Sequence, residues 1–123
     1  MGSAKSFSNE PRSVPAARHF VEDVLSPFGF EDVDARIVIT ELATNAVRHA
    51  QTPFRVSVDV DSHTIRLEVE DGAGALRIAR ELASDHTGRG LQIVEAVATE
   101  WGIDHRGEKK AVWVELPAVV DRD

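Results

Sequence analysis

An amphipathic helix is predicted for the segment Thr40-Glu41-Leu42-Ala43-Thr44-Asn45-Ala46-Val47-Arg48-His49-Ala50. At about 100° per residue, Glu41, Asn45 and His49 form one polar stripe along this helix. Beside the stripe lies a broad apolar face made of Ala35, Val38, Ile39, Leu42 and Ala46. The stripe should therefore follow the rim of the buried surface, half in water and half against protein. A carboxylate and an amide in that position suit a binding or catalytic site.

The helix that contains this segment has well-marked ends. Asp32 or Asp34 can cap its first turn by accepting hydrogen bonds from unpaired backbone N–H groups. Pro53 prevents the helix from continuing past about Ala50, because proline lacks the N–H donor and clashes with the preceding turn. We therefore expect the best-defined helix of the chain here.

An earlier helix is predicted to begin at Ser13 or Val14, with a proline in its first turn. Apolar residues recur at helical spacing after this start, until Pro27 and Gly29 stop the helix. Before it, residues 4–10 carry one large apolar side chain, and we expect them to form a short edge strand.

The period of the apolar residues changes from helical to alternating after the long helix. Residues 54–60 and 65–70 alternate between apolar and polar side chains, and residues 61–63 form a turn between them. A last alternating strand is predicted for residues 112–116, and Pro117 ends it. Strands with one apolar face need a cover, which the two helices supply. The sequence therefore predicts an α+β fold with helices packed on one face of a sheet.

Length and composition restrict the class of protein. A chain of 123 residues is expected to form a single domain over residues 1–123. No apolar run approaches the roughly 18 residues that span a bilayer, so no membrane association is expected. The absence of cysteine excludes disulfides and thiolate metal sites and is compatible with a cytoplasmic location. The net charge of −7 argues against a nucleic-acid-binding surface and permits a basic protein partner.

The first of two glycine clusters, Asp71-Gly72-Ala73-Gly74, follows the predicted strand that ends at Glu70. An ionised carboxylate there can accept a hydrogen bond from the exocyclic amine of adenine, while small residues let the base approach the backbone. Taken alone, an Asp-Gly pair at the end of a strand is more often a plain turn.

The second cluster, Gly88-Arg89-Gly90-Leu91, opens a helix that is predicted for about residues 90–100. Free N–H groups and the positive end of the helix dipole favour phosphate there, and Arg89 can add a charge-assisted hydrogen bond. Between the clusters, residues 75–87 are expected to form a short helix within a mobile segment. Taken alone, Gly-Arg-Gly before a helix is commonly a simple connection.

Three segments in this order resemble the nucleotide-binding boxes of the GHKL ATPase superfamily. They are Glu41-Leu42-Ala43-Thr44-Asn45-Ala46-Val47-Arg48-His49-Ala50, Val69-Glu70-Asp71-Gly72-Ala73-Gly74 and Gly88-Arg89-Gly90-Leu91. The nearest branch is the bacterial anti-sigma-factor serine kinases. The resemblance also covers segments near both ends of the chain, Ala16-Ala17-Arg18-His19-Phe20, Glu100-Trp101-Gly102 and Ala111-Val112-Trp113-Val114-Glu115-Leu116.

The resemblance implies a two-layer α/β sandwich of Bergerat type, with a mixed, mostly antiparallel sheet covered on one face by helices and ATP held between the layers. By position, Asn45 would ligate Mg²⁺ through its amide oxygen, which is a hard ligand suited to that ion. Glu41 would act as general base on an attacking hydroxyl, one helical turn from the metal ligand. His49 is expected to pack or to orient a neighbour.

The same resemblance assigns the nucleotide's contacts. Asp71 would read adenine, Gly74 would shape the base pocket, and residues 75–87 would form a lid. The remaining binding residues implied by position are Gly72, Ala73, Gly88, Arg89, Gly90 and Leu91. Two frames stay open for the adenine box, since Ala73 stands where the family has a glycine after the aspartate. The frame Glu70-x-Gly72-x-Gly74 restores both glycines but replaces the aspartate by glutamate.

The resemblance implies an ATP-dependent serine kinase that transfers the γ-phosphate to an antagonist protein and, in partner switching, holds a sigma factor. One alternative is a non-catalytic module that sequesters a sigma factor or antagonist without phosphorylating it. Another is a detached histidine-kinase-like domain that acts on a partner's histidine. A homodimer is plausible from the family.

Overall fold

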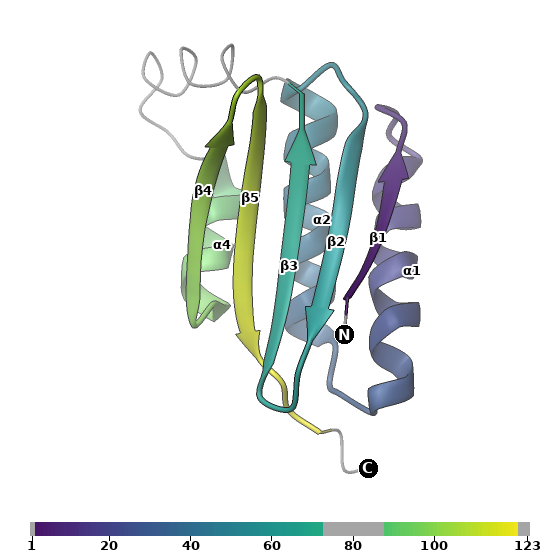
Figure 1. Ribbon diagram of the computed structural model, residues 1–123, viewed down its shortest axis with the longest axis vertical. Helices are drawn as coiled ribbons and strands as arrows, with labels where there is room; N and C mark the ends of the chain where they lie inside the picture. Colours follow the sequence, from purple (N-terminus) through teal and green to yellow (C-terminus); the bar gives the residue numbers. More distant parts are fainter. Residues whose placement is uncertain (1, 73–87, 121–123) are drawn as a thin grey trace.

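The computed structural model describes residues 2–72 and 88–120. These residues form one sheet and one layer of helices (Figure 1). In chain order the elements are β1 (Gly2–Phe7), α1 (Ser13–Leu25), the 3₁₀ helix η1 (Ser26–Phe28), α2 (Val33–His49), β2 (Phe54–Val60), β3 (Thr64–Asp71), α4 (Gly88–Val97), β4 (Glu100–Arg106) and β5 (Lys109–Pro117).

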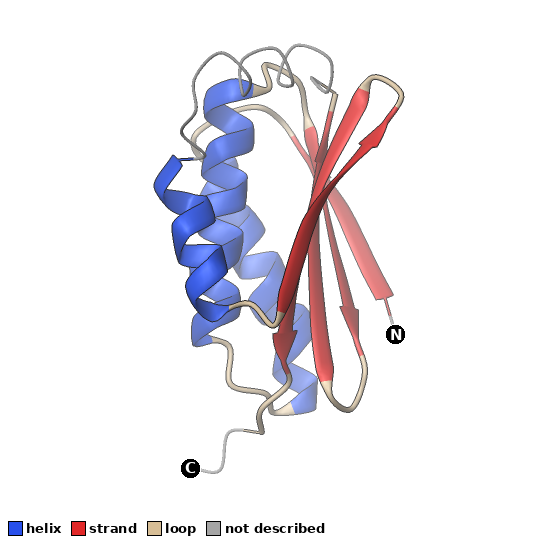
Figure 2. Ribbon diagram, turned by 90° about the vertical axis from the view of Figure 1, so that its left-hand side faces the viewer, coloured by secondary structure: helices blue, strands red, loops and turns tan. Residues whose placement is uncertain are grey.

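The sheet has the strand order β1-β2-β3-β5-β4, and each of its neighbouring pairs is antiparallel. Figure 2 shows that α1, α2 and α4 lie against the same face of the sheet. The predicted α+β class and the two-layer arrangement are therefore confirmed, and within the described residues the sheet is antiparallel throughout, where a mixed, mostly antiparallel sheet was expected.

The core forms between α2 and the two central hairpin strands. Alternation in β2 and β3 sends every second side chain toward the helices, and the register pairs these buried residues directly, as in Val58 with Leu67. Burying such a side chain stabilises the fold by roughly 1.5–3 kcal/mol. The helix contributes the apolar face that the sequence predicted, with buried Ala35, Val38, Ile39, Leu42, Ala43 and Ala46.

The two predicted helices before the hairpin are confirmed. The long helix spans Val33–His49, and the earlier one ends at Leu25 before a 3₁₀ turn. Gly29 closes that turn with φ of 68°, a left-handed conformation that glycine adopts without steric cost. The edge strand near the start of the chain is also present, although it ends at Phe7. Among the described helices, none is long and apolar enough to cross a membrane.

The segment after α4 differs from the prediction. The helix spans Gly88–Val97 instead of reaching residue 100, and a strand that the sequence did not predict begins at Glu100. Gly102 concealed this strand, because an isolated glycine weakens a strand pattern. The structure explains why glycine occupies this position, since a Cβ atom at Gly102 would lie 2.7 Å from the indole ring of Trp113 on β5. The predicted short helix within 75–87 lies outside the described residues.

Candidate functional site

The polar stripe of α2 lies where the sequence predicted. Glu41, Asn45 and His49 are half-buried, whereas their apolar neighbours on the helix are buried. Glu41 and Asn45 are four residues apart, so they are neighbours on one helix face. The stripe therefore offers a carboxylate and an amide at the edge of the core.

The hydroxyl groups near this stripe are used inside the helix. Thr40 donates to the carbonyl of Arg36 at 2.7 Å, and Thr44 donates to the carbonyl of Thr40 at 2.6 Å. Such bonds to the preceding turn hold threonine side chains against the backbone. The Thr40 and Thr44 hydroxyls are therefore engaged with the helix backbone.

Two of the predicted segments lie together at one end of the sandwich. Figure 1 shows the end of α2 and the end of β3 at the top of the view, and α4 begins lower, in the upper half of the view behind β4. The Gly72 N–H donates to Thr52 Oγ1 at 2.9 Å, and the Asn9 side chain donates to the carbonyls of Thr52 and Ala46 at 3.0 and 3.2 Å. These bonds tie the end of β3 to the end of α2 through the loop between α2 and β2. The fold thus brings the first two boxes together.

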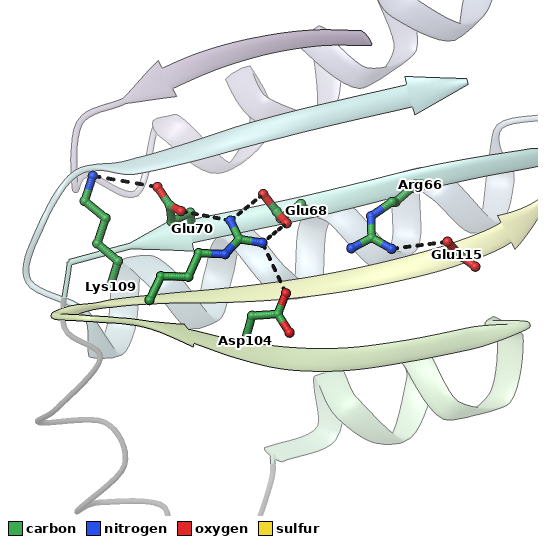
Figure 3. A network of polar contacts seen from close by, with 7 residues as sticks. Arg66, Glu68, Glu70, Asp104, Lys109 and Glu115 are labelled. Atoms are coloured by element: carbon green, nitrogen blue, oxygen red, sulfur yellow. Dashed lines mark hydrogen bonds and ion pairs between the residues drawn. The ribbon is translucent and has the colours of Figure 1, made fainter. Parts of the chain in front are cut away.

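The structure distinguishes the two frames of the adenine box. Side chains alternate along β3, so Asp71 lies on the buried, helix-facing side together with Val69, and it is 6% exposed. Glu70 lies on the opposite face, where Figure 3 shows its carboxylate between Arg106 at 3.1 Å and Lys109 at 3.8 Å. A base held between the sheet and the helices can therefore meet Asp71 and not Glu70. The frame that begins at Glu70 does not fit this geometry.

The face that carries Glu70 is a network of ion pairs. Arg106 contacts Glu68 at 2.8 Å, Glu70 at 3.1 Å and Asp104 at 3.1 Å. Hydrogen bonds to Glu68 and Glu70 are the main cause that raises the pKa of Arg106 above its ordinary value. The guanidinium therefore stays charged, and this face of β3 and its neighbours is occupied by contacts within the chain.

Sequence reasoning missed one residue at this end of the sheet. Lys110 is 1% exposed, and the register of β3 and β5 places it directly opposite Asp71. A signal was present, because counting back by twos from Leu116 through Val114 and Val112 places position 110 on the helix-facing side. Lysine is almost never fully buried without a partner, and a buried lysine beside a buried aspartate marks this position as unusual.

The other predicted residues are partly described. Gly88, Arg89, Gly90 and Leu91 occupy the first turn of α4, at the helix N-terminus that the phosphate prediction requires. Gly72 follows Asp71 and packs closely against Thr52, since a Cβ atom there would lie 3.3 Å from that side chain. Ala73, Gly74 and the lid predicted for 75–87 lie outside the described residues.

The donor atoms fit a magnesium ion that is held mainly by phosphates. Among residues 2–72 and 88–120, no group of three His, Asp or Glu side chains could hold a metal by itself. Magnesium typically uses one or two protein oxygens and completes its shell with substrate phosphates and water. The amide oxygen of Asn45, with Glu41 one turn away, is compatible with that arrangement.

A pocket at the other end of the sandwich does not compete with this site. It has a volume of about 70 Å³ and lies among Asp34, Ile65 and Leu116. Ligand sites are commonly about 300–1,000 Å³. This pocket is too small for a nucleotide.

A family profile described as the histidine kinase-like ATPase domain matches residues 7–116. The chain belongs to this family. Membership in a histidine kinase-like ATPase domain family implies ATP binding. This agrees with the nucleotide-binding boxes found on α2 and at the end of β3. No curated protein sequence matches the chain significantly.

Solved structures share the fold of this histidine kinase-like ATPase domain. The structure of the RsbU and RsbW domains of Rv1364c from Mycobacterium tuberculosis matches with a TM-score of 0.71 and 18% identity, over 100% of this chain and 35% of that chain. The Acinetobacter baumannii histidine kinase AdeS matches with a TM-score of 0.57 and 16% identity, over 94% of this chain and 68% of that chain. This chain thus spans about a third of the length of the first of these proteins. At these identities the comparisons show the fold.

Proposed function

We propose that the chain is an ATP-dependent regulatory kinase of the anti-sigma type, which transfers the γ-phosphate of ATP to a serine of an antagonist protein. The observation that carries the proposal is the polar stripe of Glu41 and Asn45, half-buried and one turn apart on α2, the helix whose C-terminal end lies beside the end of β3 that carries Asp71. Family membership and the RsbW-containing structural neighbour support it.

Glu41 acts as the general base in this proposal. Its carboxylate accepts the proton of the serine hydroxyl while the serine oxygen forms a bond to the γ-phosphorus. The bond between the γ-phosphorus and the oxygen that bridges to the β-phosphate breaks, and ADP leaves with that electron pair. Phosphoserine, ADP and the protonated carboxyl are the products, so atoms and charge balance.

The other residues bind and orient the nucleotide. Asn45 holds Mg²⁺, which when bound neutralises charge on the phosphates. Asp71 accepts a hydrogen bond from the adenine amine, and the N-terminal turn of α4, with Arg89, meets the phosphates. The antagonist and a sigma factor are the proposed protein partners, and the net charge of −7 suits partners with basic surfaces.

The test is phosphate transfer from Mg-ATP to an antagonist that co-purifies with the chain. Glu41→Ala should reduce transfer by at least 100-fold, because a positioned base typically contributes about 10²–10⁴-fold. ATP binding should persist in this variant. Glu22→Ala is the matched control, since Glu22 is a half-buried helical carboxylate that pairs with Arg36 at 3.5 Å away from the site. Transfer at the wild-type rate in Glu41→Ala would remove the assigned role.

A non-catalytic module that sequesters a sigma factor or antagonist is the second candidate. Ala73 favours it, because it stands where the family pattern has a glycine that lets the base approach the backbone. Calorimetry separates the candidates. Micromolar ATP binding that disappears in Asn45→Ala would count against the module, whereas no binding at millimolar ATP would count against the kinase.

A further inference from the structure

The buried pair Asp71 and Lys110 is the least ordinary feature of the sheet. Only three polar or charged residues are buried in the described part of the chain, and two of them are these neighbours, at 6% and 1% exposure. They face each other across β3 and β5, and directly opposed residues of antiparallel strands have Cβ atoms about 4.5–5.5 Å apart. Two charged side chains thus share one place on the helix-facing side.

Their burial has a cost that the fold does not need to bear. Moving two ions out of water is expensive, and apolar residues of similar volume are often as stable or more stable in such positions. The neighbouring positions on the same face of the sheet are apolar, with Val69 opposite Val112 and Leu67 opposite Val114. A lysine and an aspartate at the end of this apolar row therefore favour a role in binding.

The pair matches one edge of adenine. An ionised aspartate only accepts hydrogen bonds, whereas a lysine ammonium only donates and has three N–H groups. The Lys110 ammonium can therefore keep a contact within the protein and still donate to a ligand. Adenine carries an amine donor directly beside a ring-nitrogen acceptor, which is N1 on one edge and N7 on the other. An acceptor and a donor side by side on the protein complement that order.

We infer that Lys110 is a second base-recognition residue, which donates to the adenine ring nitrogen next to the amine that Asp71 binds. This inference rests on the proposed function, because it places adenine at Asp71. The adenine box of this chain thus includes a residue from β5 in addition to the residues that follow β3.

The test uses ATP, 1-deaza-ATP and 7-deaza-ATP, each titrated with magnesium by calorimetry. The wild-type chain should bind one of the two analogues roughly 10- to 100-fold more weakly than ATP, since that analogue lacks the acceptor for a charged hydrogen bond. Lys110→Met should bind that analogue and ATP with equal affinity. A merely structural lysine would not distinguish the analogues.

Lys109→Met is the matched control. Lys109 is the adjacent lysine of the same strand, but it points to the opposite face, with a side chain that is 62% exposed and lies 3.8 Å from Glu70. This variant should keep the wild-type discrimination. Circular dichroism shows whether each variant is folded. If Lys110→Met does not fold, the affinities of the wild-type chain for ATP and the two analogues still test the inference.

Two results would overturn the inference, and they differ from a failure of the proposed function. Equal binding of ATP and both analogues by the wild-type chain would remove Lys110 from base recognition while leaving the kinase intact. Unchanged discrimination in Lys110→Met would do the same. Absence of ATP binding by the wild-type chain would instead overturn the proposed function together with the inference.

Discussion

The two faces of the sheet near the end of β3 use the same residue types in opposite ways. On the helix-facing side, Asp71 and Lys110 are buried opposite each other. On the other side, Glu70 and Lys109 are their sequence neighbours and lie at 3.8 Å in a network centred on Arg106 (Figure 3). Adjacent residues on each strand thus place one carboxylate and one ammonium on the open face of the sheet and another such pair on the buried, helix-facing side.

This difference separates binding chemistry from surface chemistry. Exposed ion pairs are screened by water and salt and typically contribute about 0–1 kcal/mol. A buried charge is costly, and removal of its partner leaves it uncompensated. Removing a lysine should therefore cost little stability on the exposed face and much more on the buried face.

The largest effect on stability is expected from breaking the buried pair. Lys110→Met leaves the Asp71 carboxylate without its opposing ammonium and should lower the free energy of unfolding by about 3–5 kcal/mol. Lys109→Met should change it by less than about 1 kcal/mol. Urea unfolding followed by circular dichroism measures both variants. The double variant Asp71→Leu with Lys110→Met should recover most of the loss, and a double variant as unstable as the single one would contradict the paired interpretation.

A smaller effect is expected on the open face where β4 meets β5. The Cβ atom of Gly102→Ala would lie 2.7 Å from the Trp113 indole, whose ring also contacts the Arg66 guanidinium at 4.4 Å. The indole must shift, and overpacking of this kind costs roughly 1–3 kcal/mol. Thermal unfolding measures the loss. Adding Trp113→Ala should remove the penalty of the alanine, and a penalty that persists would place its origin elsewhere.

The smallest effect is expected from the ion-pair network itself. Arg106→Ala removes contacts to Glu68, Glu70 and Asp104 and should cost about 1 kcal/mol. Because these contacts raise the pKa of Arg106, its contribution is complete at neutral pH and would be lost only in strong alkali. Salt is therefore the useful variable, and the loss should shrink between low and high ionic strength. An effect that is independent of salt would indicate packing by the arginine stem.

Much of this fold could be predicted because periodicity reports burial directly. The spacing of Val38, Leu42 and Ala46 marks a helix face, and the alternation through Val58 marks a strand. The strand at Glu100–Arg106 escaped prediction because Gly102 has no side chain to show the alternation and is accommodated by the aromatic ring opposite it on the neighbouring strand. Contacts of that kind depend on the register of strands, which a local pattern does not report.

The candidate site shows the same division. The stripe of Glu41 and Asn45 could be found on one helix, since both residues belong to one local period. The choice between Glu70 and Asp71 required the sheet, because adjacent residues of a strand face opposite sides and only the position of the helices says which side is covered. Lys110 escaped notice because its partner lies on another strand.

The most direct test is a calorimetric titration of Mg-ATP into the wild-type chain, Asp71→Asn and Glu70→Gln. The helix-facing site predicts micromolar binding by the wild type, a loss of roughly 10- to 100-fold in Asp71→Asn and no loss in Glu70→Gln, whose carboxylate lies on the other face. An equal loss in both variants, or a larger loss in Glu70→Gln, would contradict the placement of the nucleotide between the sheet and the helices.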